Sequence, residues 1–324
     1  MEVPQAKNDI KQDIESRRLA VQKAFQLSSV LLLVCLVVAP TQGGPDDKPC
    51  SRVAKAAKDA CGDQIEADFS IAIGKCNNLP ISERDACRQQ AQADKQDARE
   101  QCAEQFNARR DVCNTLGQTE YHPIINPAEF VDGITNPFFP LTPGTTLIYS
   151  GGGEVDTFTV TDKTQTILGV RCIVVHDVVA VNGEVIEDTL DRFAQDIKGN
   201  VWYFGEVSQE FENGELVSLE GSWRAGVNGA QPGIIMKADP RAGDVYRQEF
   251  LLNEAEDLAE VMALNGSAMV PAASCNNDCL VTREFTPLEP GTTANKYYAR
   301  GIGVILEVDP STGVRTELVQ IIRP

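Results

Sequence analysis

Six cysteines in the first part of this 324-residue chain are spaced in a mirror-symmetric pattern. They are separated by 11, 15, 11, 15 and 11 residues, and they are Cys50, Cys61, Cys76, Cys87, Cys102 and Cys113. Folding the chain at the centre of the pattern makes three nested pairs: Cys76 with Cys87, Cys61 with Cys102, and Cys50 with Cys113. An antiparallel hairpin closed by three disulfides would have this symmetry, and we expect one over residues 45–118.

The same spacing predicts that both arms are α-helices. Eleven residues make about three helical turns and fifteen make slightly more than four, so the cysteines of one arm share a face. Mirror pairing sets Ala57 against Phe106 and Ile65 against Ala98. Each large side chain thus meets a small one, which lets the helices reach the Cα separation of about 4.4–6.8 Å that a disulfide needs.

A row of thiolates that stores Cu(I) or zinc is the alternative interpretation of these cysteines. Metal sites usually place two cysteines within a few residues of each other, and this spacing does not. Disulfides are typical of small exported units that bury little core. The pattern therefore favours disulfide bonds and an oxidising compartment.

Residues 1–44 are predicted to be an export signal. Arg17, Arg18 and Lys23 precede an apolar run over residues 27–39, which is shorter than the ~20 residues that a membrane span needs. We expect an exported protein, whether periplasmic, secreted or at the cell surface. If the segment stays uncleaved, it is the one part expected to contact a membrane; lipid attachment at Cys35 is a further alternative.

Composition changes near residue 118. Residues 119–143 contain five prolines and predict an extended linker. Residues 144–324 carry hairpin signals such as Asn182-Gly183 and Asn213-Gly214. Strand-like runs lie at 145–149, 156–161, 172–181, 201–203, 245–251, 280–285, 296–299, 304–308 and 315–322. The expected fold class is α+β: a helical hairpin, then an all-antiparallel β domain built as a meander, curved half-barrel, barrel or sandwich.

Three further cysteines lie in the expected β domain. Cys275 and Cys279 are close enough in the sequence to close a tight loop as a disulfide. That pairing leaves Cys172 as a buried free thiol. A bridge from Cys172 to either of the other two is an alternative that the sequence leaves open.

The negative charge of the chain is concentrated in this second part. The chain has a formal net charge of −18, and residues 121–324 hold 29 acidic and 13 basic residues, a net charge of −16. Such a field disfavours nucleic acid as a partner. Two acidic runs lack the spacing of a known calcium loop and are expected to be solvated faces. They are Glu184, Glu187, Asp188 and Asp191, and Glu254, Glu256, Asp257 and Glu260.

The chain has two tryptophans, and they stand in the segments most typical of a binding site. Tryptophan often lines ligand clefts, although it is equally common in cores. Two consecutive carboxylates could face such a cleft, as paired carboxylates do in glycosidases. The candidate ligand-binding residues are Trp202, Tyr203, Trp223, Arg224, Glu256 and Asp257.

No catalytic motif appears in the sequence. His176 lies in a strand-like run and is expected to be a sheet residue, because one histidine cannot build a usual zinc site. No Gly-x-Ser-x-Gly segment precedes a helix. The sequence therefore predicts no catalytic residue, no cofactor and no metal.

Four stretches of the chain carry a family resemblance. Residues 136–149, 199–205, 221–236 and 284–291 resemble segments of an uncharacterised family of secreted bacterial β-rich proteins. The resemblance covers about residues 120–324 and implies export and a β fold. It implies no reaction, and the cysteine hairpin lies outside it.

Together these features predict an exported, non-catalytic binding protein with a disulfide-linked helical spacer. Its partner would be a small apolar or carbohydrate-like ligand, or a surface protein. A secreted hydrolase that uses carboxylates is one alternative, and storage of metal on hairpin thiolates is another.

Overall fold

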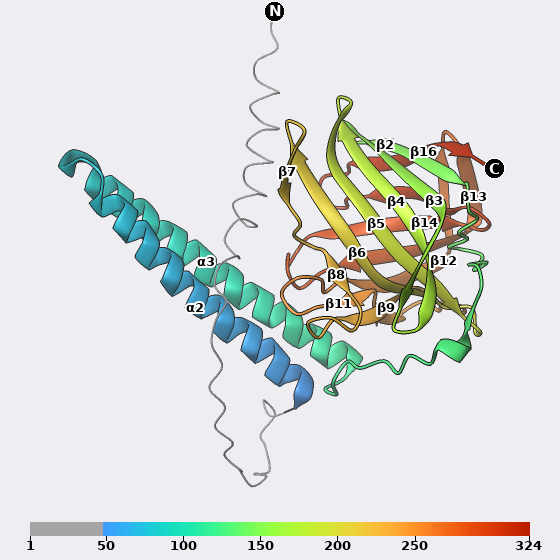
Figure 1. Ribbon diagram of the computed structural model, residues 1–324, viewed down its shortest axis with the longest axis horizontal. Helices are drawn as coiled ribbons and strands as arrows, with labels where there is room; N and C mark the ends of the chain where they lie inside the picture. Colours follow the sequence, from blue (N-terminus) through green and yellow to red (C-terminus); the bar gives the residue numbers. More distant parts are fainter. Residues whose placement is uncertain (1–47) are drawn as a thin grey trace, which may run out of the picture.

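The computed structural model describes residues 48–324, so the expected export signal lies outside the described residues. The described chain consists of a long helical hairpin and a β domain that are joined by an irregular segment (Figure 1). This is the expected α+β architecture.

The hairpin is made of helices α2 (Pro49–Asn77) and α3 (Ile81–Leu116). Proline at the first position of α2 suits a helix start, since its missing N–H has no partner there. Three disulfides join the helices as predicted, with Cα separations of 5.7 Å for Cys50–Cys113, 6.1 Å for Cys61–Cys102 and 5.5 Å for Cys76–Cys87. All six sulfurs of the hairpin are in disulfides, so none of them is a free thiolate in this structure.

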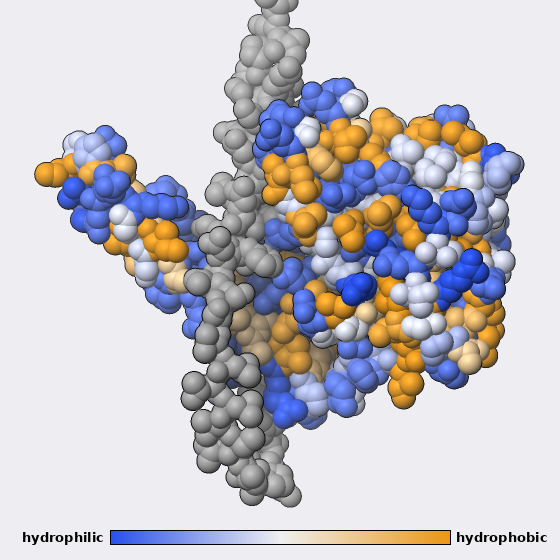
Figure 2. All heavy atoms as spheres, in the orientation of Figure 1, coloured by the Kyte–Doolittle hydropathy of each residue, from blue (hydrophilic) through white to orange (hydrophobic). Residues whose placement is uncertain are grey.

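The hairpin buries few side chains of its own. Its interior is mainly alanine and cystine, with Ala54, Ala57, Ile65 and Ala91 buried between the helices. Figure 2 shows hydrophilic residues over much of the hairpin surface and an apolar group at its free end, where Ile81 is 82% exposed. Covalent links therefore stabilise this unit more than a hydrophobic core does.

The β domain is one antiparallel sheet in the described chain. A short 3₁₀ helix, η2 (Pro127–Glu129), precedes it. The strands are β1 (Phe130–Val131), β2 (Thr146–Gly151), β3 (Glu154–Ile167), β4 (Val170–Val181), β5 (Glu184–Asp196), β6 (Val201–Glu212), β7 (Glu215–Ser218), β8 (Trp223–Arg224), β9 (Gln231–Met236), β10 (Val245–Arg247), β11 (Glu249–Phe250), β12 (Leu258–Val270), β13 (Ala273–Phe285), β14 (Thr293–Ala299), β15 (Gly303–Val308) and β16 (Arg315–Ile322).

The sheet curls into a nearly closed barrel (Figure 1). Its main strand order is β10-β12-β13-β14-β15-β16-β2-β3-β4-β5-β6-β9-β11. The two end strands, β10 and β11, are separated in the chain by Gln248 alone. One short segment therefore pairs with both ends of the sheet and brings them together.

Most strands are joined by tight turns of the expected kind. Asn182 and Gly183, between β4 and β5, have φ values of 53° and 84°. Two consecutive positive φ angles are typical of a type I′ turn, which matches the twist of a hairpin. Asn213 and Gly214 form the corresponding turn between β6 and β7.

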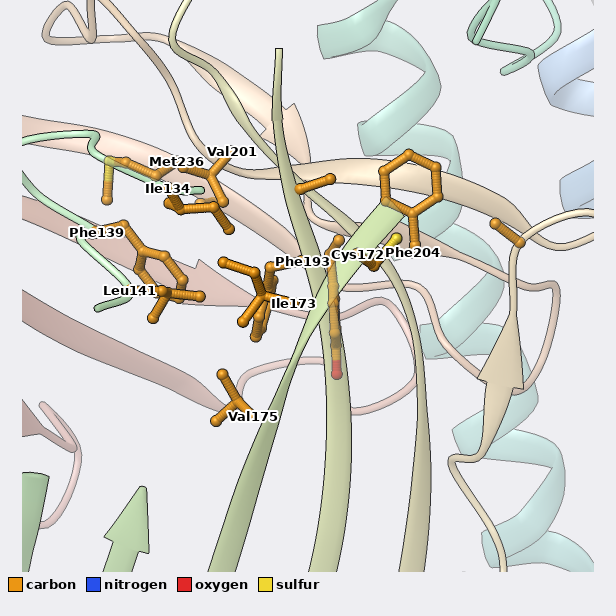
Figure 3. Close-up of a cluster of buried hydrophobic side chains, with 14 of the residues drawn as sticks. Ile134, Phe139, Leu141, Cys172, Ile173, Val175, Phe193, Val201, Phe204 and Met236 are labelled. Carbon is orange, nitrogen blue, oxygen red and sulfur yellow. The ribbon is translucent and has the colours of Figure 1, made fainter. Parts of the chain in front are cut away.

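The expected linker is part of the barrel core in its second half. Ile134, Phe139 and Leu141 are buried, and Figure 3 shows them gathered with barrel residues such as Val175 and Phe193. This segment covers one end of the barrel interior. It is therefore more than a spacer between hairpin and barrel.

Four disulfides in the described chain indicate an oxidising, extracellular environment. The fourth is Cys275–Cys279, as predicted, and Cys172 is a buried free thiol. Burial raises the pKa of the Cys172 thiol to about 12, which keeps it protonated. Neither helix of the hairpin, nor any other described helix, is long and apolar enough to cross a membrane.

Candidate functional site

A cavity of about 230 Å³ lies inside the barrel. Its lining combines aromatic rings with charged side chains, and strands from both halves of the sheet contribute to it. The rings are those of Phe139, Phe158, Phe193, Tyr149, Tyr203 and Tyr298, and the charged residues are Asp156, Asp177, Asp191, Lys296 and Glu307.

Strand register places three of the carboxyl groups on one inner face. Asp177 of β4 lies opposite Phe158 of β3, two residues from Asp156. On its other side, Asp177 lies opposite Thr189 of β5, two residues from Asp191. Since side chains two apart on a strand share a face, the three aspartates form a diagonal row across neighbouring strands.

The carboxyl of Asp177 neighbours that of Asp156, and a hydrogen bond between them favours the protonated form of Asp156. Burial, this hydrogen bond and the nearby charge of Asp177 raise the pKa of Asp156 to about 9. Oδ1 of each residue is buried, and within residues 48–324 no N–H or hydroxyl donor reaches either atom. The pair is therefore rich in acceptors and short of donors.

Asp191 is held by a tyrosine instead. The hydroxyl of Tyr203 donates to its Oδ1 at 2.5 Å, and both side chains are buried. Burial raises the pKa of Asp191 to about 7, although this hydrogen bond acts to lower it. Tyr203 stacks on Phe193 at a ring-centroid distance of 4.7 Å, which fixes its orientation.

Lys296 supplies the positive charge in the cavity lining, but its ammonium group already has partners. Its Nζ lies 2.8 Å from Oε2 of Glu284 and 3.7 Å from Oε2 of Glu307. Burial acts to raise the pKa of Glu284, yet the neighbouring ammonium keeps it below the ordinary value. The Tyr298 hydroxyl also donates to Glu284, at 2.9 Å. The Lys296 ammonium is thus shared between two carboxyl groups, and its charge also acts to lower the pKa of Asp156.

The structure places the aromatic candidates on different sides of the barrel wall. Tyr203 lines the cavity. Trp223 is buried and packs edge-on against Tyr203 at 5.3 Å, behind the lining. Trp202 faces the other way, with its Nε1 donating to Asp196 at 2.9 Å and its ring packed against Phe130. Only one of the three therefore contacts the cavity.

The charged candidates are outside the cavity lining. Arg224 is exposed. Glu256 is 1% exposed and forms an ion pair with Arg109 of α3, at 2.7 Å between Nη2 and Oε1. Arg109 also donates to Asn253 at 2.9 Å. Glu256 thus fixes the hairpin to the barrel and does not pair with Asp257 across a cleft.

The sequence interpretation missed the aspartate row and Lys296. Asp191 was grouped with a solvated acidic run, yet that run is strand β5, whose residues alternate between the two faces. Asp188 points outward to His176, with 2.8 Å between Oδ1 and Nε2, whereas Asp191 points inward. The alternation of side chains between the two faces of a strand was the available signal, because it separates Asp188 from Asp191.

Comparisons of the chain with protein-family models, with curated proteins and with solved structures found no match. The resemblance to secreted bacterial β-rich proteins therefore stays a prediction. Three of the stretches that carry it each contribute to the cavity lining, through Phe139, Tyr203 and Ile235.

Proposed function

We propose that this chain is an exported binding protein whose barrel holds a small ligand without transforming it. The observation that carries the proposal is the cavity, with rings on its wall and buried carboxyl oxygens that lack donors. Its volume is below the ~300–1,000 Å³ of sites for drug-sized ligands. The ligand is accordingly a small molecule with an apolar body and a polar group.

The positions of the tryptophans favour an apolar body over a sugar. Sugar rings commonly stack on exposed indole faces. Trp202 lies on the outer face of the barrel, and Trp223 lies behind Tyr203. The rings that reach the cavity include Phe139, Phe158 and Phe193, which offer no hydrogen bonds.

The hairpin serves in this proposal as a rigid arm. Within the described hairpin, hydrogen bonds to the barrel come from the later part of α3, through Gln105 to the Leu288 carbonyl at 2.8 Å and through Arg109. A 36-residue helix is about 54 Å long at 1.5 Å per residue, so the free end projects well beyond the barrel (Figure 1). Exposed Ile71 and Ile81 at that end are available to a surface partner.

A secreted hydrolase is the second candidate, with different carboxylates from those expected. Asp156 holds a proton beside the carboxyl of Asp177 in the cavity lining, and such a pair can serve general acid–base catalysis. Turnover of a small ester or glycoside that is lost in Asp156→Asn, with folding retained, would favour this candidate.

The test of binding is a thermal-shift screen of the disulfide-bonded protein with small apolar and sugar compounds. We expect apolar compounds to raise the melting temperature. The Ile302→Trp variant, which fills the cavity lining, should abolish the shifts; Ile197→Trp, at a site 62% exposed and outside the lining, should keep them. Absence of a shift with every compound would contradict the proposal.

A further inference from the structure

We propose that the ligand of the barrel is a small organic amine, bound as its ammonium cation by the carboxyl oxygens of Asp156 and Asp177. This inference rests on the proposed binding function and adds the chemical class of the ligand. It also adds a consequence: binding releases a proton.

The Asp156–Asp177 pair is short of hydrogen-bond donors. Oδ1 of Asp156 and Oδ1 of Asp177 are both buried without an N–H or hydroxyl partner in the described chain. Buried acceptors of this kind cost free energy unless a donor reaches them. An ammonium group brings three donors and a positive charge, whereas a hydroxyl brings one donor.

The groups around the pair make the cavity a favourable place for positive charge. Asp191 on β5 and Glu307 on β15 add further carboxyl groups to the lining, and Lys296 on β14 is already paired with Glu284 and Glu307. The tyrosines that face the cavity from β2, β6 and β14 are neutral, because burial raises the pKa of each: Tyr149, Tyr203 and Tyr298. The cavity therefore favours a cation over an anion.

Part of the cavity wall is apolar. Phe139, Phe158 and Phe193 line the same cavity, so the body of the ligand can pack against rings while its cation meets the carboxyl groups. Aromatic faces also attract an ammonium ion. A bare metal ion fits less well, since calcium takes six to eight oxygen ligands, and residues 48–324 contain no cluster of three or more His, Cys, Asp or Glu that could hold a metal.

One proton leaves the carboxyl pair for each ammonium ion that binds. The empty pair holds one proton at neutral pH, since Asp156 has a pKa of about 9. An ammonium ion needs both carboxylates ionised, so one proton passes to the solvent for each cation bound. Linkage then makes the affinity rise about tenfold per pH unit below pH 9, while a neutral ligand of the same shape releases no proton.

The test uses three probes that share a phenylethyl body: phenethylamine, 2-phenylethanol and 3-phenylpropionate. Isothermal titration calorimetry at pH 7 should show the amine binding at least tenfold more tightly than the alcohol, and no binding of the carboxylate. Titrations in phosphate and Tris should reveal one released proton for the amine. Repeating them at pH 8 should strengthen amine binding about tenfold.

Two variants and a matched control complete the test. Asp156→Asn and Asp177→Asn should each weaken amine binding at least tenfold and leave alcohol binding within a few-fold. Asp188→Asn, an outward-facing aspartate on β5 paired with His176, should leave amine binding unchanged. If either pair variant fails to fold, the proton count and pH dependence of the wild-type protein still decide the matter.

The outcomes separate this inference from the proposed function. Equal binding of amine and alcohol, or amine binding without proton release, overturns the inference and leaves a small-ligand barrel. Hits in the thermal-shift screen that include no amine do the same. Failure of every compound overturns both.

Discussion

The hairpin and the barrel achieve stability in opposite ways. The hairpin buries little apart from alanine and cystine, and three disulfides join its helices. The barrel has one disulfide, which closes a four-residue separation, and a large hydrophobic core. Because its core and closed sheet stabilise it, the barrel can keep charged groups and a cavity in its interior.

The two units meet at a buried ion pair that belongs to neither alone. Arg109 of the hairpin is 4% exposed and Glu256 of the barrel is 1% exposed. The Glu256 carboxylate also accepts a hydrogen bond from the Asn253 backbone at 2.9 Å. Substitutions in the hairpin, at this ion pair and in the barrel can each be made separately, so the covalent and the core contributions to stability can be tested one at a time.

The largest expected effect follows from removal of the three hairpin disulfides by six Cys→Ser substitutions. Each bridge is worth about 2–4 kcal/mol, with less than full additivity for nested loops. We expect the hairpin to lose its helical circular dichroism at 222 nm while the barrel keeps its tryptophan fluorescence, since Trp202 and Trp223 are both in the barrel. Retention of full helicity would contradict the comparison.

The next effect is that of Arg109→Met. This change leaves Glu256 buried without its cation, which should cost about 3–5 kcal/mol in the free energy of unfolding of the barrel. Adding Glu256→Gln should recover part of the loss. The control is Lys55→Met, which removes an exposed ion pair with Asp59 and should cost at most about 1 kcal/mol. Urea denaturation measures the free energy of unfolding of all three variants.

A third prediction concerns pH. A carboxyl whose pKa rises on folding binds more protons in the native state than in the unfolded state. The free energy of unfolding therefore falls as the pH rises from the pKa of the unfolded state to the pKa of the folded state. For Asp156 this window runs from about 4 to about 9, with a slope of at most about 1.4 kcal/mol per pH unit. Asp191 and Glu206, with pKa values of about 7 and about 8, act in the same direction.

Asp156→Asn should therefore reduce the slope of the barrel's free energy of unfolding against pH by the equivalent of about one bound proton. Asp188→Asn should leave this slope unchanged. Denaturant midpoints between pH 5 and 9 measure both. In the hairpin, hydrogen bonds from Lys95 and Arg99 lower the pKa of Glu66, so that carboxyl does not titrate in this range. A slope that Asp156→Asn leaves intact would show that the pair holds no extra proton.

The smallest effect is expected at Cys172. A protein that comprises residues 45–324 should show no reactive thiol when native and one in denaturant, because Cys172 is buried and its pKa is about 12. Six or more reactive thiols would contradict the oxidised hairpin. Ellman's reagent gives the count.

The hairpin could be predicted from the sequence because its constraint is covalent. The mirror spacing allows one nested pairing, and Cys50–Cys113, Cys61–Cys102 and Cys76–Cys87 are confirmed. In the barrel, the run predicted at 172–181 corresponds to β4, since Val170–Val181 is rich in β-branched residues. The β fold was therefore predicted, although several strand boundaries were not.

The site was harder to predict because its inner face is polar. Strand β5 was missed because inward-facing acidic residues such as Asp191 obscure the alternation of apolar and polar residues. Strand β12, which was also missed, contributes no residue to the cavity lining. Trp202 and Tyr203 show the limit of composition. They are neighbours in the sequence, but one step along a strand reverses the face, so only Tyr203 reaches the cavity.

The claim at the centre of this account is that one of two neighbouring barrel carboxyls holds a proton that a cation can replace. Carbon-13 NMR of the aspartate side-chain carboxyls, assigned with Asp156→Asn and Asp177→Asn, measures it directly. We predict one carboxyl that titrates near pH 9 in the free protein and is ionised at pH 7 when phenethylamine is saturating. Titration of both carboxyls near pH 4, unchanged by the amine, would contradict the account.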